Sequence, residues 1–225
     1  CAKVIVLSEE WRAFFDENRI CDSEKLVVLH NAVEIPEHSV DVCGRQDVLF
    51  LGRLGARKSP DVLLRAAKKV LLRHHQTRFR FGGDGDVPKY EALAREFGIA
   101  DSCDFLGWTT GAQKEEAIRA SRVFCLPSRN EGMPMSVLEA MSYGLVTIAT
   151  PVGGVPQVIK DGVNGCLMPV DDSDRLAQII DTLLDDDALA ARISTAGRKT
   201  IVDSFGMDSF MRDLIYVYEE VAAWG

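Results

Sequence analysis

The sequence predicts a doubly wound α/β fold, in which helices cover both faces of a mainly parallel sheet. Three observations predict it: short β-rich apolar runs recur, segments with helical periodicity separate most of them, and the strand-like runs stop before a helical tail. Strands that alternate with helices form βαβ units, whose right-handed crossovers place helices on both faces. The 225 residues exceed a usual domain of about 100–200 residues but fall short of two large ones, so we expect one core with additions.

The expected elements follow one another in a regular order. Seven runs rich in β-branched and aromatic residues predict strands at 3–8, 25–30, 47–52, 77–83, 102–107, 122–128 and 145–150. Apolar residues spaced three and four apart predict helices at 59–75, 90–98 and 112–121, and after Ser173 at 174–186, 187–202 and 207–224. Residues 31–46 show no clear period and contain a proline, which is typical of a linker.

This order also predicts the domain organisation. We expect residues 1–35 to be the end of a preceding domain with its linker, residues 36–205 to be the main domain, and residues 206–225 to be a C-terminal helix. The opening CAKVIVLSEEW lacks the features of a secretory signal and has no initiator Met, so we expect a cytoplasmic fragment of a longer protein. No run approaches the roughly 18 apolar residues that span a membrane.

Charge and cysteine usage exclude several classes. The formal net charge of −8 argues against a nucleic-acid surface, which needs a basic stripe to displace counterions from phosphates. The six cysteines form no Cys-x-x-Cys pair and have no neighbouring His at ligand spacing, so buried thiols in a reducing compartment are favoured over disulfides or zinc.

Glycines and charged residues follow the expected strands at the point where each one ends. They stand at Gly52-Arg53, at 82–85, at Gly107-Trp108, at 130–132 and at Gly153-Gly154. The carboxyl ends of parallel strands share one edge of a sheet, and ligands bind in the crevice outside that edge. Turns of α/β proteins need glycine in any case, but this requirement does not explain the charged residues beside them. Five strand ends therefore converge on one expected site.

The stretch NEGMPMSVLEAM has two interpretations. Pro134 suits the first turn of a helix, and Ser136 with Glu139 fits a capping box that leads into a helix ending at Gly144. On that interpretation Glu139 is a cap and Glu131 is an exposed loop residue.

The second interpretation is functional. Gly132, Met133 and Met135 surround a helix start whose backbone N–H groups, between Pro134 and Val137, can cradle a phosphate. Carboxylates on either side would then accept hydrogen bonds from sugar hydroxyls. This set suits a nucleotide-sugar.

A diphosphate also requires cations. The loop GRLGARKS supplies Arg53 and Lys58, with Arg57 as a less certain third. Taken singly, an Arg and a Lys before a helix are usually surface charges. Together with Glu131 and Glu139 they make a coherent anion site.

These motifs resemble a known family. The runs FLGRLGARKSPDVLLRAA, FGGDGD, FLGW and the segment from VFCLPSRNEGMPMSVLEAM to NGCLMPVDD resemble the C-terminal, donor-binding domain of retaining glycosyltransferases of family 4, which have the GT-B fold. The resemblance is strong over residues 48–172, and Glu131 and Glu139 complete the family's Glu, seven residues, Glu signature. It implies that the main domain is the Rossmann-like half of a GT-B fold.

The resemblance also implies roles for individual residues. Glu131 would contact hydroxyls of the transferred sugar, Glu139 the ribose, and Arg53 and Lys58 the phosphates, so that Glu131, Arg53 and Lys58 are the expected catalytic residues. The remaining expected donor-site residues are Gly52, Gly83, Asp84, Gly85, Leu106, Gly107, Gly132, Met133, Pro134, Met135 and Ser136. Departures from the family are small, since Ser59 and Ala32 stand where Gly is frequent and neither removes a charged contact.

The expected reaction is transfer of a sugar from a nucleoside diphosphate to an acceptor hydroxyl with retention. The cations and helix amides would stabilise the leaving diphosphate, so we expect no metal and no cofactor. The resemblance implies that Glu131 binds sugar hydroxyls and that the reaction proceeds without a covalent nucleophile. The acceptor could be a sugar, a lipid or a small molecule. We expect membrane-surface association only through the N-terminal domain, onto which the C-terminal helix would pack.

Three other functions compete with this one. A nucleotide-sugar epimerase can share the fold, and product analysis would separate the two. A dehydrogenase would need Gly-x-Gly-x-x-Gly, which Pro88 interrupts in GGDGDVP. The third is a module that binds a nucleotide without turnover, which would describe the fragment alone, because reaction requires a second domain closing over the sugar.

Overall fold

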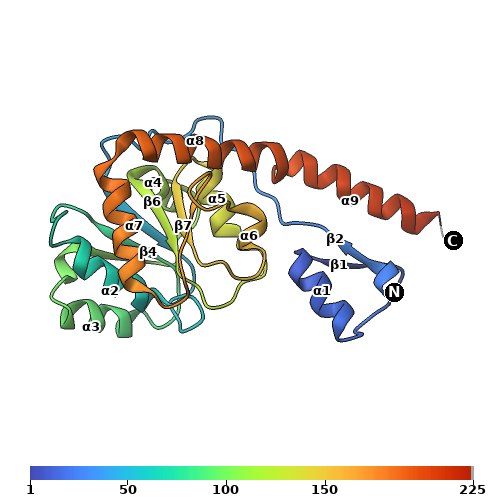
Figure 1. The fold of residues 1–225 in the computed structure, drawn as a ribbon, viewed down its shortest axis with the longest axis horizontal. Coiled ribbons are helices and arrows are strands. Elements are labelled where there is room, and N and C mark those ends of the chain that lie inside the picture. The colour runs from blue at the N-terminus through green and yellow to red at the C-terminus, as the bar shows by residue number, and fades with distance from the viewer. Residues whose placement is uncertain (224–225) are drawn as a thin grey trace.

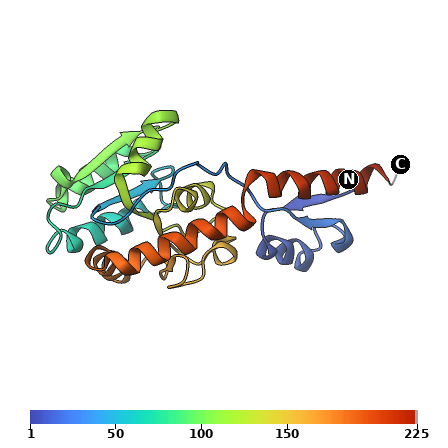
Figure 2. The ribbon, with the colours of Figure 1, turned by 90° about the horizontal axis from the view of Figure 1, so that it is seen from above.

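The computed structural model describes residues 1–223 and contains a six-stranded parallel sheet (Figures 1 and 2). Its strand order is β5-β4-β3-β6-β7-β8, and every neighbouring pair is parallel. The strands are β3 (Asp47–Leu51), β4 (Phe79–Gly82), β5 (Cys103–Gly107), β6 (Ser121–Leu126), β7 (Val146–Ala149) and β8 (Cys166–Leu167). The order reverses direction between β3 and β6, which is the switch point where such sheets bind ligands.

Helices cover both faces of this sheet. They are α2 (Pro60–Val70), α3 (Val87–Glu96), α4 (Gly111–Ala120), α5 (Met135–Ser142), α6 (Val155–Val158), α7 (Ser173–Asp185), α8 (Asp187–Ser204) and α9 (Met207–Ala222), with a short 3-10 turn at Ala100–Ser102. The helix α2 packs against α3 and α7, whereas α5 packs against α8 and β7. The central strands are therefore buried on both faces, and β6 has no exposed residue.

A smaller unit precedes the main sheet. The strands β1 (Val4–Val6) and β2 (Leu26–Val28) form a two-stranded parallel sheet, joined by α1 (Glu9–Glu17) and a 3-10 turn at Ser23–Lys25. The segment 29–46 connects the two sheets, and α9 runs from the main body alongside the smaller one (Figures 1 and 2). An ion pair of 3.3 Å joins Lys3 Nζ to Glu220 Oε2 at the far end.

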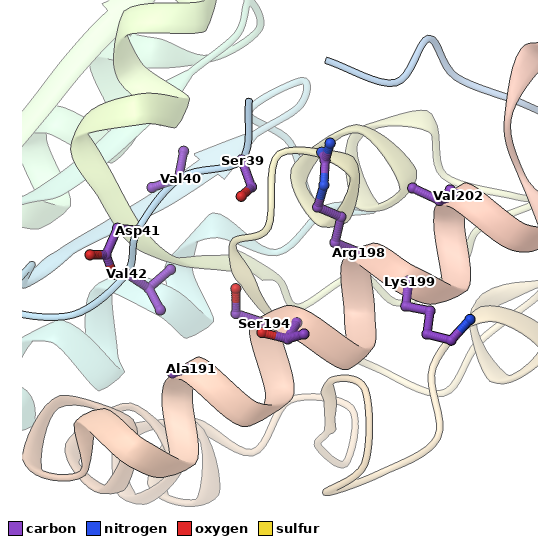
Figure 3. Close-up of a pocket in the computed structure, with 10 residues that line it drawn as sticks. Ser39, Val40, Asp41, Val42, Ala191, Ser194, Arg198, Lys199 and Val202 are labelled. Atoms are coloured by element: carbon purple, nitrogen blue, oxygen red, sulfur yellow. The ribbon is translucent and has the colours of Figure 1, made fainter. Parts of the chain in front are cut away.

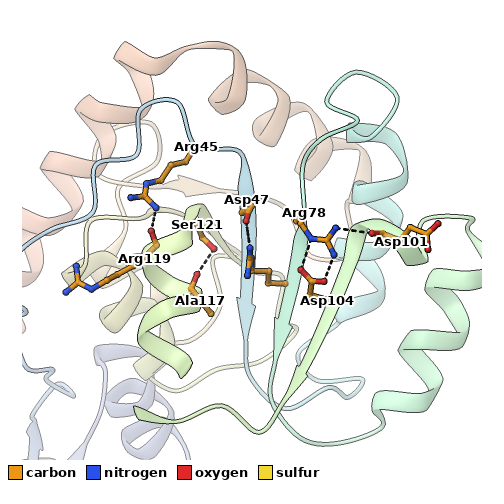
Figure 4. A network of polar contacts seen from close by, with 9 residues as sticks. Arg45, Asp47, Arg78, Asp101, Asp104, Ala117, Arg119 and Ser121 are labelled. Atoms are coloured by element: carbon orange, nitrogen blue, oxygen red, sulfur yellow. Dashed lines mark hydrogen bonds and ion pairs between the residues drawn. The ribbon is translucent and has the colours of Figure 1, made fainter. Parts of the chain in front are cut away.

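The N-terminal ends of the strands carry paired charges (Figure 4). Arg80 of β4 donates to Asp47 at the start of β3 at 2.8 Å. Arg78 donates through Nε to Asp104 of β5 at 2.8 Å, with a second contact from Nη2. The hydrogen bonds from the Arg78 guanidinium lower the pKa of the Asp104 carboxyl. These cations are neutralised within the fold, so this edge of the sheet is structural.

The structure confirms all seven predicted strands and the helical tail after Ser173. Asp172 caps α7 by accepting a hydrogen bond from the Arg175 amide. The sequence missed β8, because two residues are too few to show a period. The helix predicted at 59–75 ends at Val70. The helix predicted at 207–224 extends to Ala222, and Trp224 lies outside the described residues.

The predicted capping box is wrong. The helix α5 begins at Met135, and Pro134 takes the N-cap position without a side-chain hydrogen bond. Ser136 is therefore already inside the helix, and the Glu139 carboxylate pairs with Lys114. The predicted end of the helix is right, since α5 ends at Ser142, two residues before Gly144.

The cysteine prediction holds in part. Cys103, Cys125 and Cys166 are buried, whereas Cys1 and Cys43 are exposed.

Within residues 1–223, no helix has both the length and the apolar character needed to cross a membrane.

Candidate functional site

A cavity of about 370 Å³ opens at the C-terminal ends of β3 and β4, where the sequence predicted a site. It is lined by eight of the predicted residues: Gly52, Arg53, Lys58, Gly83, Asp84, Met135, Ser136 and Glu139. The other lining residues are Leu51, Gly82, Trp108, Thr109, Thr110 and Lys114. Loops distant in sequence thus meet at the edge of the sheet, as the strand order requires.

The other predicted residues do not line this cavity. Leu106 and Gly107 belong to β5, Gly85 faces the Leu54 carbonyl, and residues 131–134 are not among the lining residues. Gly107 still shapes the wall, because its carbonyl accepts the Gly83 N–H at 2.7 Å. Gly83 has φ +147, and a Cβ there would lie 2.0 Å from the Gly52 carbonyl oxygen. The close approach of the two backbones after β3 and β4 therefore requires glycine at position 83.

Glu131 is buried and paired with two cations, which differs from the exposed loop residue of the structural interpretation. Its side chain is 5% exposed, and Lys58 Nζ donates to Oε1 at 2.5 Å. Arg57 Nη1 lies 3.5 Å from Oε2 and donates to the Asn130 carbonyl at 3.1 Å. A buried carboxylate is strongly unfavourable without such partners. Because Lys58 also lines the cavity, Glu131 is one side chain away from it.

Arg53 has a different environment. It is exposed and lines the cavity, and its guanidinium makes no ion pair among the described residues. An arginine fork with unused donors beside a cavity can bind phosphate in bidentate fashion. Arg53 is therefore the cation most available to an incoming anion.

The start of α5 supplies backbone donors. The Val137 N–H donates to the Pro134 carbonyl at 3.1 Å, so it is not available as the sequence suggested, and proline itself has no N–H. The first two helical residues, Met135 and Ser136, both line the cavity. The first N–H groups of a helix have no partner within the helix and attract anions.

Glu139 projects from the next turn of α5 and also lines the cavity. Its Oε1 lies 2.5 Å from Lys114 Nζ of α4, and the two side chains are 25% and 33% exposed. Sequence reasoning missed Lys114, because a lysine on an amphipathic helix gives no sign of which loop it faces.

Two further contacts hold the loops of the site together. Asn31 Nδ2 donates to the Met133 carbonyl at 2.9 Å. Arg129 is bound by Asp171 and donates through Nη1 to the Ala56 carbonyl at 2.8 Å. The cation loop and the carboxylate loop are thus fixed relative to each other.

A second cavity, of about 520 Å³, lies elsewhere (Figure 3). It is formed between residues 39–42 of the connecting segment and α8, and it contains none of the predicted site residues. Arg198 beside it donates to the Pro36 carbonyl at 2.7 Å and to the Ser142 carbonyl. Its guanidinium thus serves to tie the connecting segment to the end of α5.

A parallel sheet with a cation-lined cavity at the carboxyl ends of its strands is the arrangement of a ligand-binding α/β protein. Comparison with known families makes the class specific. The family of group 1 glycosyl transferases matches residues 34–200, more than half of the chain. The chain belongs to this family.

Curated relatives agree with the family. A phosphatidyl-myo-inositol mannosyltransferase of Mycolicibacterium smegmatis is 32% identical over 211 residues, covering 87% of this chain and 53% of that protein. A D-inositol 3-phosphate glycosyltransferase of Salinispora arenicola is 33% identical over 189 residues, covering 79% of this chain and 42% of that protein. The chain therefore spans about half the length of these relatives.

Solved structures share the fold. Anabaena HepE in complex with UDP has a TM-score of 0.88 at 20% identity, covering 98% of this chain and 64% of that one. Staphylococcus aureus TarM, in a mutant complex that contains UDP, has a TM-score of 0.84 at 24% identity, covering 96% of this chain and 44% of that one. The α/β fold with helices on both faces is thus that of GT-B glycosyltransferases.

Proposed function

We propose that the chain is the donor-binding half of a glycosyltransferase that transfers a sugar from a nucleoside diphosphate to an acceptor hydroxyl with retention. One observation carries the proposal: Arg53, Lys58, Glu139 and the start of α5 line a single cavity, with Glu131 bound to Lys58. This arrangement supplies cations for a diphosphate and carboxylates for hydroxyl groups. Family membership and the UDP bound in the similar structures support it.

The charges suit the chemistry of transfer. As the bond to the sugar breaks, the sugar becomes cationic and the diphosphate gains negative charge. Arg53, Lys58 and the N–H groups of Met135 and Ser136 stabilise that leaving group in our proposal. A preorganised donor of this kind contributes about 3–4 kcal/mol to the transition state. These donors take the role of a divalent metal, so we propose a reaction without metal or cofactor.

Lys58 links the two halves of the site. It touches the cavity and also holds the Glu131 carboxylate at 2.5 Å. In our proposal Glu131 accepts hydrogen bonds from hydroxyls of the transferred sugar and Glu139 from the ribose. When a diphosphate binds, Lys58 would also interact with the phosphate oxygens, and its ion pair with Glu131 would weaken. The Glu131 carboxylate would then be able to turn toward the sugar.

The rest of the protein completes the enzyme in this proposal. Because the relatives are about twice as long, we assign residues 1–35 to the end of an N-terminal domain and residues 206–225 to a helix that packs on it. Exposed apolar side chains on α1 and α9, among them Phe14 and Ile215, support this assignment. The acceptor would lie on that domain, so in our proposal the present chain binds nucleotide without turnover. We also propose a cytoplasmic location.

Calorimetry with UDP, GDP and ADP tests the proposal. We expect one of them to bind, and we expect Arg53→Ala to weaken the diphosphate about 100-fold while leaving the corresponding nucleoside unchanged. The matched control is Arg175→Ala, an exposed arginine of α7 outside the cavity. Equal losses for diphosphate and nucleoside would contradict the role of Arg53, and no binding of any nucleotide would contradict the function.

A further inference from the structure

Lys114 is a cation of the cavity whose charge the proposed function does not use. It lies on α4 and lines the cavity together with Arg53 and Lys58 of the cation loop. Its Nζ approaches Glu139 Oε1 at 2.5 Å, within hydrogen-bond distance. Both side chains are partly buried in the wall of the cavity. Each of the two carboxylates of the site is therefore held by a lysine of its own, Glu131 by Lys58 and Glu139 by Lys114.

The position of Glu139 explains why such a contact matters. Lys114, Met135 and Glu139 line the donor cavity, and the same three residues line a neighbouring cavity of about 460 Å³. This neighbouring cavity is formed with residues 32–36 of the connecting segment and with Met207. The Lys114–Glu139 pair therefore stands in the wall between two open spaces. A carboxylate without a partner could adopt rotamers that point into either space.

The ion pair also divides the acceptor capacity of Glu139. An ionised carboxylate offers two oxygens and can accept several hydrogen bonds. With Oε1 bound to Lys114, Oε2 keeps its full capacity for hydroxyl groups of a ligand. Hydrogen bonds to a charged acceptor are stronger than those between neutral groups and depend on orientation. Fixing the carboxylate therefore sharpens its preference for a ligand with hydroxyls in matching positions.

We propose that Lys114 is a positioning residue that fixes the Glu139 carboxylate and thereby sets the preference for ribose over deoxyribose in the donor. This inference rests on the proposed function, because it needs a nucleotide whose ribose meets Glu139. It goes beyond that function by assigning sugar discrimination in the nucleotide to a residue of α4.

The test compares the nucleoside diphosphate that binds best among UDP, GDP and ADP with its 2′,3′-dideoxy analogue. We expect the wild-type chain to prefer the ribonucleotide by about tenfold or more, since each lost hydrogen bond to a charged group reduces affinity by about that factor. In Lys114→Met we expect ribonucleotide affinity to fall about tenfold, with the dideoxy analogue bound almost as before. The ratio of the two affinities, ribonucleotide to dideoxy analogue, then approaches one. Lys114→Arg should restore a preference above that of Lys114→Met.

A second variant and a control make the test specific. Glu139→Gln should lose the same preference, and adding Lys114→Met to it should change the preference no further, because both act on one carboxylate. The control is Lys199→Met, which removes a comparable 2.6 Å pair with Asp203 on α8. It should leave both affinities unchanged.

The outcomes separate the two proposals. If the wild-type chain binds no nucleoside diphosphate, the proposed function fails and this inference fails with it. If the chain binds ribonucleotides but Lys114→Met keeps the wild-type preference, only the role of Lys114 is overturned. A uniform loss of affinity for both analogues would likewise overturn it, because it would show a general charge effect on the phosphates.

Discussion

Gly153 offers a way to displace the site without removing a polar group. This residue has φ +57, and a Cβ placed there would lie 1.9 Å from the Glu131 carbonyl oxygen and 2.8 Å from the Gly132 oxygen. The next residue, Gly154, donates its N–H to the Gly132 carbonyl at 2.5 Å. In Gly153→Ala the two loops must separate, and the carboxylate loop is the one that carries Glu131.

The size of the effect follows from the geometry. Ordinary van der Waals contact would require the Glu131 carbonyl to retreat by about 1.5 Å, and a misplacement of about 1 Å can reduce catalysis 100-fold. A left-handed backbone conformation adds about 1–2 kcal/mol of strain once a Cβ is present. Gly162 supplies the matched control, because it has φ +69 but its Cβ would meet no atom within 4 Å. Gly162→Ala therefore carries the backbone strain without the clash.

Three measurements on the two variants separate strain from displacement. Urea unfolding should show a loss of about 1–2 kcal/mol in Gly162→Ala and a larger loss in Gly153→Ala. Calorimetry should show weaker donor binding only in Gly153→Ala. In the full-length protein, that variant should also lose about 100-fold in transfer rate. Equal stability and equal donor affinity in the two variants would refute the reasoning, because the clash would then have no consequence for the Glu131 loop.

Two further predictions concern titratable groups. The folded-state pKa of Asp104 is lowered by the hydrogen bonds from Arg78, so the pair stabilises the fold above the unfolded pKa of about 3.9 and loses that contribution as pH falls through the folded value. Asp104→Asn should therefore lower the urea midpoint at pH 7 and have little effect near pH 2, and an effect independent of pH would contradict this. Burial raises the pKa of Cys103 to about 12 and that of Cys166 to about 11, and it also raises the pKa of Cys125. Iodoacetamide at pH 8 should label the exposed Cys1 and Cys43 in the native chain and the three buried thiols only after unfolding, as peptide mass analysis would show.

Sequence periodicity was sufficient for the fold because local and tertiary preferences agree. The runs VLFL of β3 and VFCL of β6 are continuously apolar, as expected of strands covered on both faces, and both are central strands. The strand at Cys166–Leu167 shows the limit of this reasoning. It is defined by backbone pairing with β7 rather than by its own side chains, and two residues cannot display a period of two.

The site was predictable to the extent that strand order determines it. Arg53, Asp84 and Ser136 follow three different strands, and the parallel sheet brings all three to one cavity. Whether a particular side chain faces that cavity depends on contacts between loops. Glu131 is buried and bound to Lys58, and Lys114 reaches Glu139 from the helix α4. Such contacts join residues 25 to 73 positions apart, which no local pattern encodes.

The hydrogen bond from Asn31 to the Met133 carbonyl gives the connecting segment a mechanical role. Asn31 lies in the stretch that joins the two sheets, and its amide nitrogen is 2.9 Å from the carbonyl of Met133, two residues before α5 begins. A change in the angle between the sheets must therefore break this bond or pull on the backbone that orients the first amides of that helix. Movement of one half of the molecule is in this way transmitted directly to the place where the diphosphate would rest.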